Sequence, residues 1–577
     1  AQQMRALCKS AMEEARKCVP CSSPAFREDL ERLAPVVRGI FSLVRDFGEE
    51  FSAAKAERSA ADFSDYAYWT LDLVVQKDGS PTDLARELSD RFEEILLDEY
   101  QDTNRLQDCI FRAISRNGEN LFLVGDLKQS IYRFRSADPT VFAEKQERFS
   151  EDGAFPALLR LSRNFRSRAG VLDAVNCVFS QIMSPEVGGV AYQGGEMVGS
   201  PGMDHSPALI GQVQLIDLKE SGTEDSRVLA EARQTARRIA AMLRKGYPVT
   251  EKGVLRPCRG GDFAILLRSA QGADGIYCEA LREEGVDASV TASEGYFTSR
   301  EVAVMLSLLE VLDNPLQDIP MAALYLSPMG GGTCDGLAAL RLRHPDTPLY
   351  NALNDEARAG DPQAAELLSL LSSLREKAAV KRVRALIQYI YDATDFVEVV
   401  SGLSASAERE ANLKLLLNYA GSYEKQGSGE LSGFVAYIRR LMEEKKDFEV
   451  ANPLTEEANA VRILTAHRSK GLEYPIVILG NCSKAFNLRD LTGDVCYSAQ
   501  AGYGLRVIRR DTAQRYETVP SAAARLRERA DAVSEEQRLL YVAMTRARET
   551  LILNITERNL GGKLSKLSGL LEGTAPL

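Results

Sequence analysis

Hydrophobic residues near the start of the chain recur at alternating steps of three and four. The series consists of Leu30, Leu33, Val37, Ile40, Val44, Phe47 and Phe51. Because an α-helix repeats every 3.6 residues, this spacing places all of them on one helical face. The pattern predicts a long opening helix that packs its apolar face against another part of the protein.

Two short apolar runs, residues 95–97 and 121–124, come shortly before the aspartates Asp98 and Asp126. The apolar positions between them, within residues 106–114, have helical spacing. Strand, helix, strand units of this kind build parallel sheets, and ligands bind beyond the carboxyl ends of parallel strands. Both aspartates are therefore expected where a ligand would bind.

Strand-like runs recur further along the chain, at residues 213–216, 263–267, 461–465, 475–479 and 551–555. Helical spacing dominates from about residue 324 to residue 448. Clear examples are Leu367, Leu368, Leu371 and Leu374, followed by Leu386, Ile387, Ile390 and Tyr391. A Gly- and Pro-rich stretch at residues 184–207 predicts a long loop. The pattern predicts an α/β fold class, with an all-helical domain inserted between two pieces of the second sheet domain.

The length of 577 residues, 45% of them hydrophobic, provides enough apolar material for two to four compact domains. Apolar stretches stay well short of the roughly 20 residues that span a bilayer, so we expect a cytoplasmic protein without membrane contact. The ten cysteines are mostly scattered singly, as free thiols are. Cys18 and Cys21 have CxxC spacing, but no second pair or nearby histidine completes a metal site.

A net charge of −11 argues against a protein that coats nucleic acid by bulk charge, so any DNA contact must be local. One local basic cluster consists of Arg160, Arg163, Arg166 and Arg168. Such a run is compatible either with anion binding or with an ordinary solvated surface.

The first stretch with candidate chemistry is DEYQDTN at residues 98–104, directly after a predicted strand. Nucleotide hydrolysis needs one carboxylate to hold Mg²⁺ and another to orient and deprotonate the attacking water. Asp98 and Glu99 are suited to these two tasks. The alternative is a polar turn in which Asp102 or Thr103 caps the next helix.

The second stretch is GDLKQSIYRFRSAD at residues 125–138, after the neighbouring strand. Gln129 could sense a γ-phosphate, while Tyr132, Phe134 and Arg135 could stack on and hold single-stranded bases. The alternative is an ordinary loop whose aromatic side chains fill the core.

Together these stretches resemble motifs II and III of the UvrD-like superfamily 1 helicases. Three further stretches resemble later motifs in the order in which that family has them: RNFRS at residues 163–167 (motif IV), TAHRSKGLEY at residues 465–474 (motif V) and EQRLLYVAMTRA at residues 536–547 (motif VI). Within the superfamily, the DFSD stretch at 62–65, Leu127-Lys128 and residues 313–320 are similar to the AddA type, with the RecB type as nearest competitor.

The resemblance implies a role for each matched residue. Asp98 corresponds to the Mg²⁺ ligand, Glu99 to the general base and Gln129 to the γ-phosphate contact. Arg166 and Arg546 correspond to arginines that reach the triphosphate from the second motor domain, and Glu473 to an acid near the nucleotide sugar. Single-strand contacts are implied for Tyr132, Phe134, Arg135, Thr465 and His467. Alternatively, His467 could be a helix-start histidine and Arg546 could pair with an acid on its own helix.

The resemblance further implies ATP and Mg²⁺ as cofactors, single-stranded and double-stranded DNA as ligands, and an AddB-like partner protein. It implies 3′ to 5′ movement in the repair of double-strand breaks by recombination. The expected domains are a partial first RecA-like domain with a helical 1B-like remnant (1–155), a second RecA-like domain in two pieces (156–320 and 456–577), and an inserted helical 2B-like domain (321–455).

The phosphate-binding loop of such motors, GxxxxGK followed by Ser or Thr, does not occur in the sequence. The Gly-Gly-Lys at residues 561–563 is followed by Leu564, and Glu557 stands where the first glycine would be. We therefore expect motif I to precede Ala1 in a longer parent, the C-terminal nuclease domain to be absent, and this chain alone not to hydrolyse ATP. The alternative is a non-catalytic scaffold that binds DNA or a partner protein.

Overall fold

The computed structural model describes residues 22–151, 153–185, 187–192, 197–199, 212–217, 226–269, 272–290, 296–402, 406–426, 429–443, 459–486, 488–509 and 513–557, and singly Arg5, Lys9 and Met12. The CxxC pair, residues 561–563 and much of the predicted loop at 184–207 lie outside these residues. The chain divides into two compact units, one formed by Ala1–Glu224 with Thr465–Leu577 and the other by Asp225–Leu464.

The first unit opens with helices and a small parallel sheet. In chain order these are α2 (Ser23–Glu57), α3 (Phe63–Val74), α4 (Asp83–Arg91), β1 (Ile95–Leu97), α5 (Arg105–Ala113), β2 (Leu121–Leu123) and α6 (Pro139–Arg148). Strands β1 and β2 are parallel, with Ile95 opposite Leu121. The predicted strand, helix, strand unit is therefore confirmed. Leu96 and Phe122 are 67% and 56% exposed, so one face of this two-stranded sheet is open.

The DFSD stretch at residues 62–65 fixes the start of α3. Asp62 accepts a hydrogen bond from the backbone N–H of Asp65, and Asp65 accepts one from the backbone N–H of Asp62. This capping box satisfies N–H groups that a helix start otherwise leaves unpaired. Lys55 of α2 donates to both carboxylates and so ties α2 to α3.

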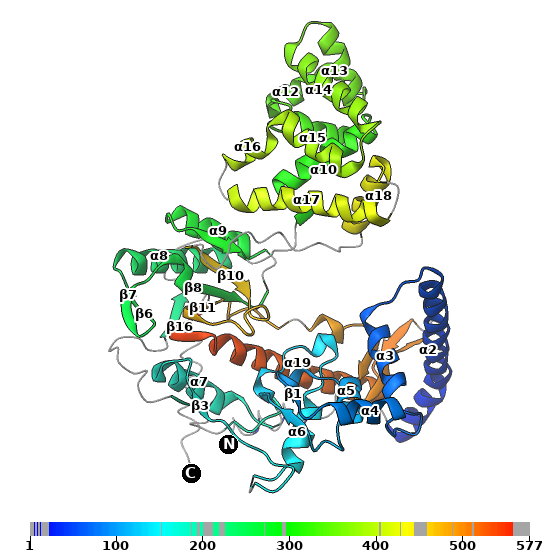
Figure 1. Ribbon diagram of the computed structural model, residues 1–577, viewed down its shortest axis with the longest axis vertical. Helices are drawn as coiled ribbons and strands as arrows, with labels where there is room; N and C mark the ends of the chain where they lie inside the picture. The colour runs from blue at the N-terminus through cyan, green and yellow to red at the C-terminus, as the bar shows by residue number, and fades with distance from the viewer. Residues whose placement is uncertain are drawn as a thin grey trace. The chain divides into compact units, whose positions relative to one another are not determined.

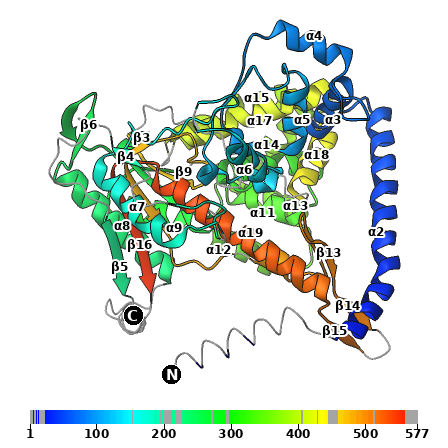
Figure 2. The same cartoon turned by 90° about the horizontal axis from the view of Figure 1, so that it is seen from below.

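The long opening helix is confirmed as α2, but only its first part is packed as predicted. Leu33, Val37 and Ile40 pack against β13 (Gly502–Leu505) and β14 (Val507–Arg509), close to β15 (Gln514–Tyr516) (Figure 2). Further along the same face, Phe47 is 66% exposed. The prediction of a fully packed face is wrong here because periodicity defines a helical face without supplying the element that covers it.

A parallel sheet forms the other part of the first unit. Strand β16 (Ala547–Glu557) lies between β5 (Gln212–Asp217) and β11 (Tyr474–Gly480) and is parallel to both. The remaining elements are β3 (Arg163–Asn164), α7 (Ala169–Ile182), β4 (Val198–Gly199), β12 (Val495–Ser498) and α19 (Val519–Met544). Figure 1 shows α19 as the long helix that leads into β16. This connection carries the predicted motif VI.

The second unit contains a smaller set of strands and two covering helices. Its strands β8 (Phe263–Leu267), β10 (Val461–Thr465) and β9 (Ala288–Val290) lie side by side in that order, and β10 is parallel to β9. The unit also holds α8 (Arg227–Arg244), α9 (Asp274–Glu283) and an antiparallel hairpin of β6 (Pro248–Glu251) and β7 (Val254–Pro257). All five residues of β8 are buried, which explains their uninterrupted apolar run.

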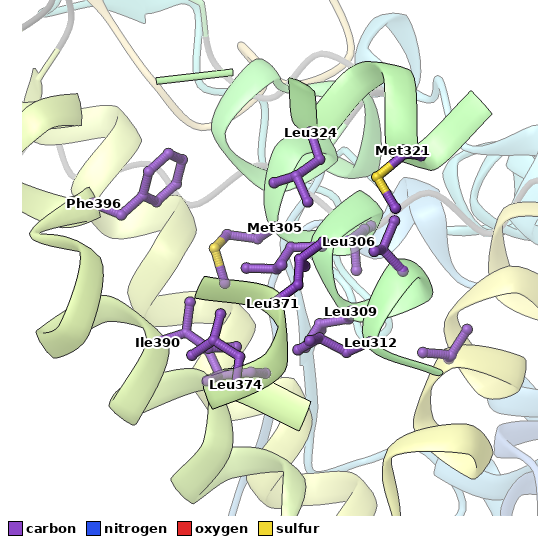
Figure 3. Packing of buried hydrophobic residues seen from close by; sticks show 14 of the residues in the cluster. Met305, Leu306, Leu309, Leu312, Met321, Leu324, Leu371, Leu374, Ile390 and Phe396 are labelled. Atoms are coloured by element: carbon purple, nitrogen blue, oxygen red, sulfur yellow. The ribbon is translucent and has the colours of Figure 1, made fainter. Parts of the chain in front are cut away.

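Between β9 and β10 the described chain is helical, and the helices begin at Arg300, earlier than the helical run expected from about residue 324. The helices are α10 (Arg300–Asp313), α11 (Asp318–Tyr325), α12 (Cys334–Arg343), α13 (Leu349–Arg358), α14 (Pro362–Ala378), α15 (Val383–Thr394), α16 (Phe396–Ser401), α17 (Ser406–Gln426) and α18 (Leu431–Glu443). Their shared core includes Leu309 of α10, Leu371 and Leu374 of α14 and Ile390 of α15 (Figure 3). None of the helices in the described part of the chain has the length and hydropathy to cross a bilayer.

Candidate functional site

The two carboxylates predicted to act on a nucleotide stand at the carboxyl end of β1. Asp98 accepts a hydrogen bond of 2.8 Å from the backbone N–H of Glu99. Glu99 has a φ of 51°, in the left-handed region that non-glycine residues rarely adopt. Both side chains are exposed. A strained residue at a strand exit is a common feature of functional sites, because the surrounding structure must hold it there.

Gln101 joins the two predicted stretches and was missed by the sequence analysis as a site residue. It is only 1% exposed. The amide nitrogen donates a hydrogen bond to Glu99, and the amide oxygen accepts one of 2.9 Å from the backbone N–H of Asp126. Gly125 allows this approach, since a Cβ there would lie 2.5 Å from the Gln101 Oε1. The exits of β1 and β2 are thereby held together by one buried amide.

Gln129, the predicted γ-phosphate contact, lies at the exit of β2. Its amide donates to the Asp126 carboxylate over 3.1 Å. The same carboxylate accepts from the backbone N–H of Lys128 over 3.1 Å, which closes a tight turn after the strand. The structure thus places Gln129 on the same sheet edge as Asp98 and Glu99.

Lys470, from the predicted motif V, reaches this edge although no role was predicted for it. Its ammonium donates hydrogen bonds to the Asp102 carboxylate and, over 2.9 Å, to the backbone carbonyl of Gln129. The same ammonium lies 3.6 Å from the Glu99 carboxylate and 4.9 Å from the centre of the Tyr132 ring. Its side chain is 6% exposed. Burial raises the pKa of Asp102, although Lys470 acts in the opposite direction. A buried ammonium this close to two carboxylates compensates part of their negative charge.

A cavity of about 480 Å³ lies beside the predicted motif IV. It is lined by Arg163, Asn164, Phe165, Arg166, Glu473 and Arg548. Arg166 donates to Glu473 over 2.7 Å, and Arg548 lies 3.6 Å from the other oxygen of the same carboxylate. The volume falls within the roughly 300–1,000 Å³ of small-molecule sites. Three arginines around one glutamate leave a surplus of positive charge that suits an anionic ligand.

Arg546 does not line this cavity. It is 2% exposed, and its guanidinium donates to the carbonyls of Val542 (2.8 Å) and Leu472 (3.2 Å) and to the Thr545 hydroxyl (3.1 Å). Burial, reinforced by the nearby charge of Arg166, lowers the pKa of Arg546 to about 10. The alternative of an ion pair with an acid on its own helix is not what these hydrogen bonds show.

The basic run at residues 160–168 does not form one surface. Arg160 pairs with Glu151 over 2.7 Å, Arg166 pairs with Glu473, and Arg168 forms a buried pair with Glu549 over 2.8 Å. These glutamates come from three separate parts of the chain, so closeness in sequence does not create a common patch. Of the four arginines, Arg163 and Arg166 line the cavity.

Four of the five residues with a predicted single-strand role lie together. Phe134 is 67% exposed, with its ring centre 5.8 Å from Tyr132 and 5.7 Å from His467. The Arg135 guanidinium lies 5.4 Å from the Tyr132 ring and 5.7 Å from the Phe134 ring. Residues from the predicted motifs III and V thus form a partly exposed aromatic and cationic cluster. The fifth, Thr465, accepts from the backbone N–H of Arg468 over 3.4 Å and fixes the turn after β10.

Comparison with known families agrees with this arrangement. The family model of the UvrD/REP helicase N-terminal domain matches residues 40–150, and that of the UvrD-like helicase C-terminal domain matches residues 159–558. The chain belongs to the UvrD-like helicase family.

Curated relatives refine the likeness. The chain is 37% identical over 92% of its length to the A subunit of an ATP-dependent helicase/nuclease from Pelotomaculum thermopropionicum, of which the match covers 46%. It is 35% identical over 99% of its length to the protein of the same name from Geobacillus thermodenitrificans, of which 48% is covered. The predicted AddA-type resemblance is confirmed by these relatives. The chain spans about half the length of the curated relatives it matches.

Proposed function

We propose that this chain supplies the catalytic carboxylates, the anion-binding arginines and the single-strand contacts of an ATP-dependent DNA helicase of the AddA type. One observation carries the proposal. Lys470 of motif V contacts Asp102 of motif II and Gln129 of motif III, while His467, three residues earlier, contacts Phe134. The proposed nucleotide residues and the proposed DNA residues are therefore connected by one short segment.

The carboxylates fit a magnesium ion of the kind that accompanies a nucleotide. Mg²⁺ in such sites takes one or two protein carboxylates and fills its other positions with water and phosphate oxygens. Asp98 and Glu99 are adjacent, exposed and at a strand exit, and no group of three or more potential ligands occurs among the described residues. We propose Asp98 as the ligand; the bound ion would neutralise charge on the phosphates.

Glu99 is proposed as the general base that takes the proton of the attacking water. Its carboxylate accepts a hydrogen bond from the buried amide of Gln101, which restricts where the carboxylate lies. Gln129 is proposed to contact the γ-phosphate. Arg166 and Arg546 are proposed to stabilise the charge of the transferred phosphoryl group, and Glu473 to lie near the nucleotide sugar. Because the sequence has no phosphate-binding loop, we propose that a segment outside this chain supplies it.

Tyr132, Phe134, Arg135, Thr465 and His467 are proposed to grip one DNA strand. Exposed aromatic rings stack on bases of any sequence, and a nearby guanidinium adds attraction to the backbone. The relatives are named as one part of a helicase/nuclease that has more than one kind of chain. The word subunit in that name supports the proposal of an AddB-like partner protein. We further propose a role in the repair of double-strand breaks by recombination, as the motif resemblance implies. Movement in the 3′ to 5′ direction is part of the same proposal.

We further propose a division of the chain into RecA-like motor parts and an insertion. Residues 1–155 would belong to a first motor domain, 156–320 with 456–577 to a second, and 321–455 to a helical 2B-like insertion. The parallel pairs β1 with β2 and β11 with β16, and the helical run from α12 to α18, support this division.

Binding of single-stranded DNA to this chain tests the proposal. Phe134→Ala should weaken the binding of a short fluorescein-labelled oligothymidine, measured by anisotropy, by about tenfold, since one stacking contact is lost. Phe63→Ala is the matched control, because Phe63 is 95% exposed on α3 and has no proposed role. Equal affinities for the two variants and the wild type would contradict the proposed DNA site, and would favour a scaffold that binds a partner protein.

A further inference from the structure

Arg133 stands between the two aromatic residues of the proposed DNA site but faces a different part of the protein. Its guanidinium donates to both oxygens of Glu528, at 2.7 and 2.8 Å, and lies 3.8 Å from Asp531. Its backbone N–H donates to Glu535 over 3.3 Å. All three acids belong to α19. Arg133 therefore holds the segment that carries Tyr132 and Phe134 against this helix.

The three acids form one stripe on α19. Positions 528, 531 and 535 are three and four residues apart, which places them on one helical face. Arg538 extends the stripe by donating to the Ser130 carbonyl over 2.7 Å. The segment is thus attached to α19 at two successive points, before and after Tyr132.

The contact is partly screened from water. The side chains of Arg133, Glu528 and Asp531 are 35%, 18% and 27% exposed. Partial burial lowers the pKa of Arg133, but the hydrogen bond and the charge of Glu528 raise it by more, so the pKa of Arg133 is raised overall. Burial raises the pKa of Glu535. The arginine therefore stays charged at all physiological pH values.

An arginine in a DNA-binding segment would ordinarily be assigned to a phosphate of the DNA. Here the geometry separates two neighbouring arginines. Arg135 lies over the rings of Tyr132 and Phe134, whereas Arg133 is occupied by α19. The helix that holds Arg133 ends at Met544, two residues before Arg546. The same helix therefore connects the aromatic pair with the arginine proposed to act on the triphosphate.

We infer that Arg133 is a positioning residue: its contact with Glu528 and Asp531 of α19 holds Tyr132 and Phe134 in the orientation that binds single-stranded DNA. The inference rests on the proposed function, since it concerns the same DNA site. It differs from that proposal in assigning to Arg133 and Glu528 a role that involves no contact with DNA.

The experiment compares Arg133→Met and Glu528→Gln in the complete chain, by anisotropy of labelled oligothymidine at several salt concentrations. Each variant should weaken binding by about tenfold, the loss expected when an aromatic stacking contact is misplaced. The slope of log affinity against log salt should stay at the wild-type value, because no phosphate contact is removed. A lost phosphate contact would reduce that slope by about 0.7.

Glu528→Gln is the decisive variant, because it removes a negative charge from a DNA-binding protein. By charge alone it should strengthen binding, whereas loss of positioning should weaken it. The double variant Arg133→Glu with Glu528→Arg restores the pair with reversed charges and should return the affinity to within about threefold of wild type. Arg105→Met is the control, since Arg105 forms an exposed pair with Glu144 away from α19.

The outcomes separate the inference from the proposed function. If Glu528→Gln binds as tightly as the wild type or more tightly, and Arg133→Met reduces the salt slope, Arg133 contacts phosphate and the inference is wrong. If Phe134→Ala weakens binding but neither Arg133→Met nor Glu528→Gln does, the DNA site stands and only the inference fails. If the wild type does not bind, the proposed function fails and the inference fails with it.

Discussion

At the scale of single residues, Lys470 and Asp102 are the pair on which the site depends most. The pair is partly buried, with side-chain exposures of 6% and 19%. Removing one partner of such a pair leaves an uncompensated charge, so Lys470→Met should lower the free energy of unfolding by about 3 kcal/mol. Urea denaturation followed by circular dichroism measures this change.

The double variant Lys470→Met with Asp102→Asn serves as its control. It should be more stable than Lys470→Met alone, because the orphaned carboxylate is removed as well. If the two single substitutions instead have simply additive effects, the pair does not interact in the way described.

Gly125 provides a second test at this scale. A Cβ at this position would meet the Gln101 Oε1 at 2.5 Å and the Phe142 ring at 3.0 Å. Gly125→Ala should therefore destabilise the protein by about 2 kcal/mol through overpacking. Gly48→Ala in α2, where nothing lies within 4 Å, should stabilise it slightly by improving helix propensity. A thermal melt that places both variants on the same side of the wild type would refute this account.

The sequence identified most of the candidate site, but not the residues that connect its parts. Asp98, Glu99 and Gln129 could be predicted because each follows a short apolar strand in a recognisable stretch. Gln101, Lys470 and Arg133 could not, because their role depends on partners brought close only by the fold. Lys470 and Asp102 are separated by 368 positions in sequence. No local pattern encodes a contact of that range.

At the scale of secondary-structure elements, the helical core between β9 and β10 allows a matched comparison. Leu374 of α14 is fully buried in the shared core, whereas Leu342 of α12 is 83% exposed. Leu374→Ala should lower the free energy of unfolding by about 3 kcal/mol, from lost burial and the cavity that remains. Leu342→Ala should change it by less than about 0.5 kcal/mol. Chemical denaturation of the two variants checks the difference, and similar losses would contradict the described packing.

Helical and strand periodicity predicted these elements well, since α2, α14, α15, β1, β2 and β8 appear where the apolar pattern placed them. What periodicity could not supply is the partner of each face. Phe47 of α2 lies on the same apolar stripe as Leu33, yet of the two only Leu33 is buried. Which part of a face is covered depends on distant chain segments such as β13 and β14.

At the scale of the whole molecule, the net charge does not predict where anions bind, because binding depends on the charges around each site. The net charge of −11 would discourage DNA binding, but the proposed DNA cluster contains Arg135 and the cavity is lined by three arginines. Arg166→Met should weaken the binding of ATP or of a labelled ATP analogue to a protein that contains both this chain and a phosphate-binding loop. Single-strand affinity of the same variant should remain unchanged, because Arg166 lines the cavity and not the aromatic cluster. Loss of both activities together would contradict two separate sites.

DNA-stimulated ATP hydrolysis tests the central claim most directly. It should be measured for this chain and for the same chain joined to a segment with a phosphate-binding loop. The joined protein should also be tested with Glu99→Gln and, as a control, with Glu119→Gln, since Glu119 is exposed. We expect ATP hydrolysis only in the joined protein. Glu99→Gln should lower its rate at least about 100-fold, whereas Glu119→Gln should leave the rate unchanged. Hydrolysis by this chain alone, or undiminished hydrolysis with Glu99→Gln, would contradict the account.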